Sequence, residues 1–205
     1  MAHQPHLVTS GPDSGARAVA LVLHGGSAVS VAPARHGVAY ARMVPFARGI
    51  AHATRGQDVA VWLLRYRVRG WNEPVLDPVL DGRWALDEAR RLHPGAPIVL
   101  VGHSMGGRVA LRLAGEPDVA GVCALAPWIE PGEPWRPVTA SVLIAHGDRD
   151  RVTDPIASAA YAAQIGASFV PVPGEKHALL RRPIFWQRLV TEFVTTVLGT
   201  TSPAR

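Results

Sequence analysis

The sequence predicts an α/β fold, a doubly wound and mostly parallel sheet with helices on both faces. Two observations lead to this prediction. Short apolar runs of strand-like length alternate along the chain with longer segments of helical periodicity. Four motifs rich in Gly, His, Ser and Asp begin where such apolar runs end, which is where functional loops gather in a parallel sheet.

The individual elements follow from the spacing of apolar residues and from flanking turn residues. Apolar runs bounded by Gly, Pro or Asp predict strands over 19–25, 59–67, 97–104, 121–127, 141–148 and 168–174. Helical periodicity predicts helices over 79–92, 104–115, 155–166 and 183–198, and a further helix within 40–54.

Length and composition indicate one domain. The chain has 205 residues, 48% of them hydrophobic, and no change in composition marks a second domain. We expect an N-terminal extension over 1–18, the domain over 19–198 and a tail over 199–205. The single cysteine, Cys123, lies in an apolar run, which predicts a packed core thiol.

Charge and hydropathy argue against two classes of partner. No apolar run approaches the roughly 18 residues of a membrane span, and the N-terminus lacks the features of a secretory signal, so we expect a cytoplasmic protein. The net charge is +5, but the basic residues are scattered among acidic ones and form no stripe interleaved with aromatics, which disfavours nucleic-acid binding. Arg65, Arg67 and Arg69 alternate at strand spacing; an ion-paired or solvated face is favoured there over an anion site.

A serine between glycines follows the predicted strand 97–104. The segment GHSMGG, residues 102–107, directly precedes a helical pattern. At a sharp strand-to-helix turn Ser104 would be strained and exposed, and Gly102 and Gly106 would have to be small for the turn to close. The N–H of Met105 would then point toward a developing oxyanion. The flanking glycines favour a nucleophile over the alternative, a serine that caps the helix.

The remaining motifs occur in an informative order. HGG ends the first predicted strand, HGDRDRVTD follows 141–145 and contains Asp150, and PGEKHALL contains His177. Ser, then Asp, then His is the order of the α/β hydrolases. From about Val19 to Leu198 the chain therefore resembles the α/β-hydrolase superfamily, specifically its small serine esterase, lipase and thioesterase-like members.

The resemblance implies a catalytic triad. Ser104 would be the nucleophile, and His177, just before the final helix, would be the base and then the acid. Three aspartates crowd one loop. The resemblance implies Asp150 as the member that orients His177, with Asp148 as a turn former and Asp154 as a helix cap.

The resemblance also implies an oxyanion hole. Its second N–H would come from Gly26, the residue after the HG pair, and Ser27 remains the alternative donor. The histidines beside the motifs are expected to have structural roles: His24, His103 and His146. No motif has metal-ligand, nucleotide or dinucleotide spacing, so we expect no metal and no cofactor.

The family often carries a helical cap, and here the corresponding connection is short. Residues 128–140 are rich in proline and link two predicted strands, which predicts a minimal cap or none and an open Ser104. The candidate substrate-binding residues are Ser27, Trp128 and Ile129, and Trp135 is a further candidate. The alternative is that the aromatic side chains fix the loop to the core.

These residues predict a serine hydrolase that cleaves a small-molecule carboxylic ester or thioester through an acyl-enzyme. One alternative is an acyltransferase or thioesterase of a biosynthetic pathway. Another is a binding protein that kept the fold, which the presence of all three triad residues disfavours. The natural substrate, the acyl acceptor and the oligomeric state stay open.

Overall fold

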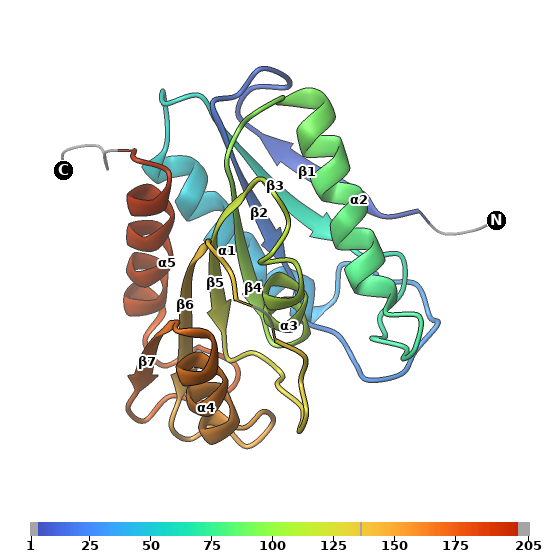
Figure 1. Cartoon of the computed structure of the whole chain (residues 1–205), viewed down its shortest axis with the longest axis vertical. Helices are drawn as coiled ribbons and strands as arrows, with labels where there is room; N and C mark the ends of the chain where they lie inside the picture. The colour runs from blue at the N-terminus through green and yellow to red at the C-terminus, as the bar shows by residue number, and fades with distance from the viewer. Residues whose placement is uncertain (1–3, 136, 201–205) are drawn as a thin grey trace.

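The computed structural model describes residues 4–135 and 137–200. One seven-stranded sheet crosses the molecule in the order β1-β3-β2-β4-β5-β6-β7 (Figure 1). All neighbouring strands are parallel except β1 and β3. The predicted fold class is thereby confirmed. The strands are β1 (His6–Ser10), β2 (Ala18–Leu23), β3 (Val59–Arg65), β4 (Ile98–His103), β5 (Val119–Leu125), β6 (Ser141–Gly147) and β7 (Ser168–Val172).

Helices cover both faces of the sheet and bury two separate apolar cores (Figure 1). In the fully buried β2, Val19, Leu21 and Leu23 face one core. Ala18, Ala20 and Val22 face the other, as the two-residue period of a strand requires. The helices are α1 (Val38–Ala53) and α5 (Pro183–Val197) over the second core, and α2 (Asp77–Leu92), α3 (Met105–Arg112) and α4 (Pro155–Ile165) over the first.

Strand β1 is the element that the sequence did not predict. It lies within the segment expected to be an extension, residues 1–18, and pairs with β3 at the edge of the sheet. Its side chains are mostly exposed, so it has no apolar run to mark it, and backbone hydrogen bonds to β3 hold it in place. Most of the expected tail, residues 201–205, lies outside the described residues.

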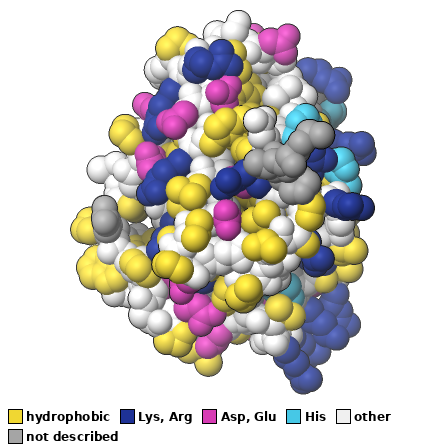
Figure 2. Space-filling view, turned by 90° about the vertical axis from the view of Figure 1, so that its right-hand side faces the viewer, with side chains coloured by type: hydrophobic (Ala, Val, Ile, Leu, Met, Phe, Trp, Pro, Cys, Tyr) yellow, Lys and Arg dark blue, Asp and Glu magenta, His cyan; other side chains and the backbone are white. Residues whose placement is uncertain are grey.

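Charged side chains form ion pairs over part of the surface. Arg90 of α2 lies 2.8 Å from carboxylate oxygens of both Asp87 and Asp118. Figure 2 shows acidic and basic side chains side by side on one part of a face, with basic side chains gathered along its right-hand edge. Strand β3 ends at Arg65, so Arg67 lies beyond the strand and pairs with Asp81. The expectation that Arg65, Arg67 and Arg69 share one strand face is therefore wrong.

The segment between β5 and β6, where related enzymes often carry a helical cap, is a short loop here. Its described residues, 126–135 and 137–140, contain neither helix nor strand.

Cys123, on β5, is fully buried, and burial raises the pKa of its thiol to about 12, as expected of a core residue. No described helix has the length and apolar character to cross a membrane.

Candidate active site

Ser104 lies at the tip of a strained turn between β4 and α3. Its φ of 57° and ψ of −120° are unusual for a residue with a side chain. The turn closes because two glycines allow close backbone contact. A Cβ on Gly102 would lie 2.1 Å from the carbonyl oxygen of Gly106, and a Cβ on Gly106 would lie 2.3 Å from that of Leu23. The predicted need for small residues at both positions is confirmed.

Ser104, His177 and Asp150 form one hydrogen-bonded line. His177 Nε2 lies 3.0 Å from Ser104 Oγ, and His177 Nδ1 lies 2.7 Å from Asp150 Oδ2. The three residues follow β4, β7 and β6, so parallel strands bring them to the same edge of the sheet (Figure 1). With Nδ1 protonated, Nε2 is free to accept the serine proton.

The carboxylate of Asp150 is buried and fully hydrogen-bonded. Its Oδ1 accepts the backbone N–H groups of Val152 and Thr153 at 2.7 and 3.1 Å. Its Oδ2 accepts from His177, from the hydroxyl of Thr153 at 2.9 Å, and from His146 Nε2 at 3.1 Å. Burial raises the pKa of Asp150, but the hydrogen bonds from His146, His177 and the two amides lower it by more, so its pKa lies below the ordinary value. Asp150 is therefore an anion.

The other two aspartates of this loop have structural contacts. Asp148 Oδ1 accepts the N–H of Gly174 at 2.7 Å, which joins the loops after β6 and β7. Asp154 caps α4 by accepting the N–H of Ile156 at 2.8 Å, as predicted. Neither carboxylate contacts His177.

Two backbone amides beside Ser104 are available to a ligand. Among the described residues, neither the N–H of Gly26 nor that of Met105 has a hydrogen-bond partner. The N–H of Ser27 donates to the carbonyl of Arg69 at 2.9 Å. This contact favours Gly26 over Ser27 as the second donor of an oxyanion hole. A Cβ on Gly26 would lie 2.4 Å from the same carbonyl oxygen, so the position requires glycine.

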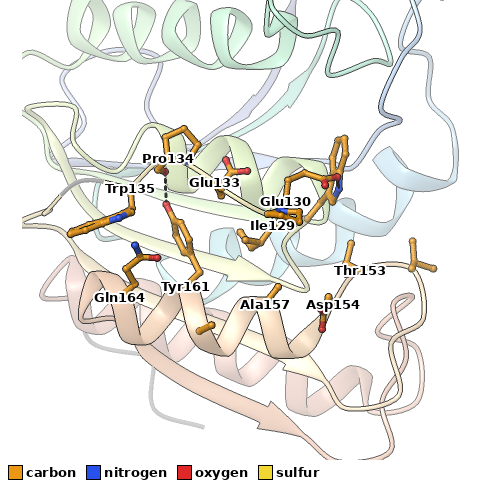
Figure 3. A pocket seen from close by; sticks show the side chains of 15 residues that line it. Ile129, Glu130, Glu133, Pro134, Trp135, Thr153, Asp154, Ala157, Tyr161 and Gln164 are labelled. Carbon is orange, nitrogen blue, oxygen red and sulfur yellow. Dashed lines mark hydrogen bonds between the residues drawn. The ribbon is translucent and has the colours of Figure 1, made fainter.

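Trp128 and Ile129 line a cavity of about 920 Å³. Figure 3 shows Ile129 on its wall together with Thr153 and Tyr161. Ser104 itself does not line it. Two lining residues connect the cavity to the site. The Thr153 hydroxyl lies 3.2 Å from His177 Nδ1, and the backbone N–H of Trp128 donates to the carbonyl of Ser104 at 3.2 Å. Tyr161 rises from α4 and donates to the carbonyl of Pro134 at 3.1 Å, which holds the wall of the cavity to the helix (Figure 3). The tentative substrate-binding residues Trp128, Ile129 and Trp135 thus share one cavity, which Ser27 does not line.

Comparison with known proteins identifies the family. A sequence model of the α/β-hydrolase domain matches residues 36–184, most of the chain. The chain belongs to the α/β-hydrolase family. No curated protein sequence matches it.

Solved α/β hydrolases share the fold over nearly the whole chain. An α/β serine hydrolase homologue from Coxiella burnetii is 20% identical, with a TM-score of 0.72, and 93% of this chain and 91% of that one are covered. A serine hydrolase without a lid from Xanthomonas campestris is 20% identical, with a TM-score of 0.71 and coverage of 98% and 91%. A thermophilic esterase from Thermogutta terrifontis, solved with butyrate bound, is 17% identical, with a TM-score of 0.73 and coverage of 98% and 92%.

The structure adds residues that the sequence did not single out. Arg108 of this α/β hydrolase is almost fully buried, and its guanidinium lies 4.2 and 4.6 Å from the ring centroids of Trp71 and Trp128. Glu133 binds it at 2.7 Å and binds Arg112 at 2.5 Å. These contacts fix the loop that carries Trp128 to α3. The partners are distant in sequence, and no motif marks them.

The described residues contain no cluster of His, Cys, Asp or Glu suited to a metal ion.

Two buried histidines support the site as neutral side chains. His24 Nδ1 donates to the carbonyl of Gly25 at 2.6 Å, and its Nε2 accepts the N–H of Tyr66 at 3.4 Å. His103 Nε2 donates to the carbonyl of His177 at 2.8 Å. Burial lowers the pKa of His24 to about 4 and that of His103 to about 3. The structural roles expected for both agree with these contacts.

Mild acid is therefore expected to destabilise the fold. In the unfolded chain both histidines titrate near pH 6.5, whereas in the folded chain burial lowers the pKa of His24 to about 4 and that of His103 to about 3. Below about pH 6.5 the unfolded state binds more protons, so each histidine lowers the free energy of unfolding by up to about 1.4 kcal/mol per pH unit. Urea unfolding between about pH 7 and pH 5 measures the slope. A free energy of unfolding that stays constant over this range would contradict burial of neutral imidazoles.

Proposed function

We propose that this α/β hydrolase is a serine hydrolase that cleaves a carboxylic ester or thioester through an acyl-enzyme. The observation that carries the proposal is the line of hydrogen bonds from Ser104 through His177 to Asp150. It ends at a strained turn whose neighbouring amides, those of Gly26 and Met105, have no partner among the described residues. Such a constellation is the geometry of nucleophilic acyl transfer.

In the proposed reaction Ser104 Oγ attacks the acyl carbon and His177 Nε2 takes the hydroxyl proton. The amides of Gly26 and Met105 stabilise the oxyanion of the tetrahedral intermediate. When the intermediate collapses, the bond to the leaving alcohol or thiol breaks, and His177 returns the proton to that group. Water then repeats the sequence on the acyl-enzyme. Asp150 keeps the proton of His177 on Nδ1 and stabilises the imidazolium.

The cavity beside Trp128 is proposed to hold the acyl group. Its walls combine aromatic and proline side chains, which can pack against an acyl chain, with polar side chains such as Glu130, Asp154 and Gln164. The Thermogutta terrifontis esterase, which shares the fold, was solved with butyrate, a short acyl product. The absence of helix from the described residues between β5 and β6 supports an open site.

A substrate panel tests the proposal. p-Nitrophenyl esters of increasing chain length, run beside acyl-CoA thioesters, are expected to be hydrolysed with saturation kinetics and a preference for soluble acyl groups. Addition of alcohols or amines tests the alternative of an acyltransferase, because an acceptor that captures the acyl group forms a new ester or amide. A protein that hydrolyses no member of the panel and binds acyl compounds unchanged would support the binding-protein alternative.

Replacement of Trp128 by alanine is expected to shift chain-length preference toward longer or bulkier acyl groups. Removing the indole enlarges the cavity, and pocket packing of this kind is worth about 1–3 kcal/mol, so relative kcat/KM values should change by about ten-fold or more. The measurement is the ratio of kcat/KM for long and short p-nitrophenyl esters. Trp84→Ala, in α2, is the control for loss of an indole outside the cavity. An unchanged ratio would assign Trp128 to loop packing alone.

A further inference from the structure

Asp150 is shared by two histidines. His146, at the end of β6, is completely buried, and its Nε2 lies 3.1 Å from the Oδ2 that also accepts from His177. His146 Nδ1 lies 2.8 Å from the hydroxyl of Ser158, a fully buried residue of α4. One hydrogen-bonded chain therefore runs from Ser158 through His146, Asp150 and His177 to Ser104. The buried half, from Ser158 through His146 to Asp150, thus has the same order of residue types, Ser, His and Asp, as the half that begins at Ser104.

The chemistry of Asp150 fixes the protons along this chain. An ionised carboxylate only accepts hydrogen bonds, so His146 must carry a proton on Nε2 and His177 must carry one on Nδ1. When His146 carries this single proton, its Nδ1 atom is an acceptor, and the hydroxyl of Ser158 donates to it. Thr153 is the remaining polar side chain in contact, with its hydroxyl 3.2 Å from His146 Nε2. No charged group other than Asp150 bonds to His146 among the described residues.

The two carboxylate oxygens are held in different ways. Backbone amides fix Oδ1, whereas Oδ2 depends on side chains: His146, Thr153 and His177. Of these three side chains, His146 is the fully buried ring, and its other nitrogen, Nδ1, is hydrogen-bonded to Ser158. Loss of its N–H would let Oδ2 move relative to His177 Nδ1, and displacement by a fraction of an ångström weakens proton transfer.

We infer that His146 is a positioning residue for the proposed hydrolysis: its Nε2–H holds Oδ2 of Asp150 on His177 Nδ1, and Ser158 fixes the tautomer that makes this possible. The inference rests on the proposed function. During acylation one proton moves from Ser104 Oγ to His177 Nε2, while the proton on His177 Nδ1 stays in place. His146 and Asp150 exchange no proton in this step.

Kinetics of three variants test the role. His146→Leu removes the donor and is expected to lower kcat by about ten- to a hundred-fold with KM changed by less than about three-fold, because positioning of Asp150 and not substrate binding is lost. His146→Gln, whose side-chain amide can donate to Oδ2, is expected to restore most of kcat. Ser158→Ala is expected to give a smaller loss, because His146 remains. His93→Leu is the matched control. His93 is also buried and accepts a hydrogen bond from the N–H of Ala16, but it lies before the amino end of β4, whereas the site lies at the carboxyl ends of the strands.

Imidazole N–H resonances give a test that needs no activity. In protein with ¹⁵N-labelled histidine, wild type is expected to show two N–H protons shifted downfield by one carboxylate, one from His177 and one from His146. His146→Leu should remove one and shift the other, whereas His93→Leu should leave both unchanged. Should His146→Leu fail to fold, His146→Gln and Ser158→Ala supply both readouts, because Ser158→Ala is expected to shift the His146 resonance.

The outcomes separate the two hypotheses. Full kcat in His146→Leu, or equal losses in His146→Gln and His146→Leu, would overturn the positioning role while an active wild type upholds the esterase. A wild type without esterase activity would overturn the proposed function, and the two resonances would still decide whether His146 and His177 share Asp150. A single downfield resonance in wild type would overturn the shared carboxylate.

Discussion

Replacement of Ser104 by alanine is expected to reduce ester hydrolysis by about four to six orders of magnitude while the fold stays intact. The acyl-enzyme cannot form without Oγ, and residual turnover would come only from binding and from the amides of Gly26 and Met105. Alanine tolerates the positive φ of this turn about as well as serine does, and the helix loses no side-chain cap. Initial rates with p-nitrophenyl acetate, with circular dichroism as the check on folding, give the measurement.

Ser168→Ala is a suitable control because Ser168 is exposed at the start of β7, far along the chain from the strained turn at Ser104. It should keep wild-type activity. A Ser104→Ala protein that retains more than about one part in a hundred of the wild-type rate would contradict a nucleophilic role.

Asp150→Asn is expected to lower kcat by about three to four orders of magnitude, and Asp148→Asn by less than about ten-fold. An amide at position 150 can turn its NH₂ toward His177 Nδ1, which moves the histidine proton to Nε2 and leaves no acceptor for the serine proton. Asp148 bonds to Gly174 and not to His177, so its amide variant keeps the tautomer.

The comparison of kcat for both variants at the same pH, about 8, separates them. Unfolding curves of both proteins control for stability, since Asp150 also accepts two backbone N–H groups. If Asp148→Asn were the more damaging change, the assignment of the acid would have to move to Asp148.

The sequence predicts most of the architecture because the elements that build it are locally encoded. The buried strands are continuous apolar runs. The turn at Ser104 is marked by Gly102 and Gly106, where a side chain would overlap the backbone. Strand β1 escapes prediction because an exposed edge strand needs only a backbone partner, and β3 is remote in the sequence.

The finer parts of the site depend on contacts between distant segments. The resemblance favours Gly26 as the second donor and leaves Ser27 as the alternative, and the hydrogen bond from the Ser27 N–H to Arg69 supports Gly26. The link from His146 to Ser158 joins the end of β6 to α4 in three dimensions. His146 begins the motif HGDRDRVTD, but nothing in the sequence marks Ser158 as its partner. Order along the chain suffices to propose Ser104, Asp150 and His177, whereas the groups that hold them depend on tertiary packing.

The central claim is that Ser104 is a nucleophile activated by His177. It is tested most directly by intact-mass measurement after treatment with a fluorophosphonate, followed by mapping of the modified peptide. The account predicts one covalent adduct per chain, located on the peptide that contains Ser104, and no adduct on Ser104→Ala or on heat-unfolded wild type. An unmodified folded protein, or an adduct that persists in Ser104→Ala, would contradict it.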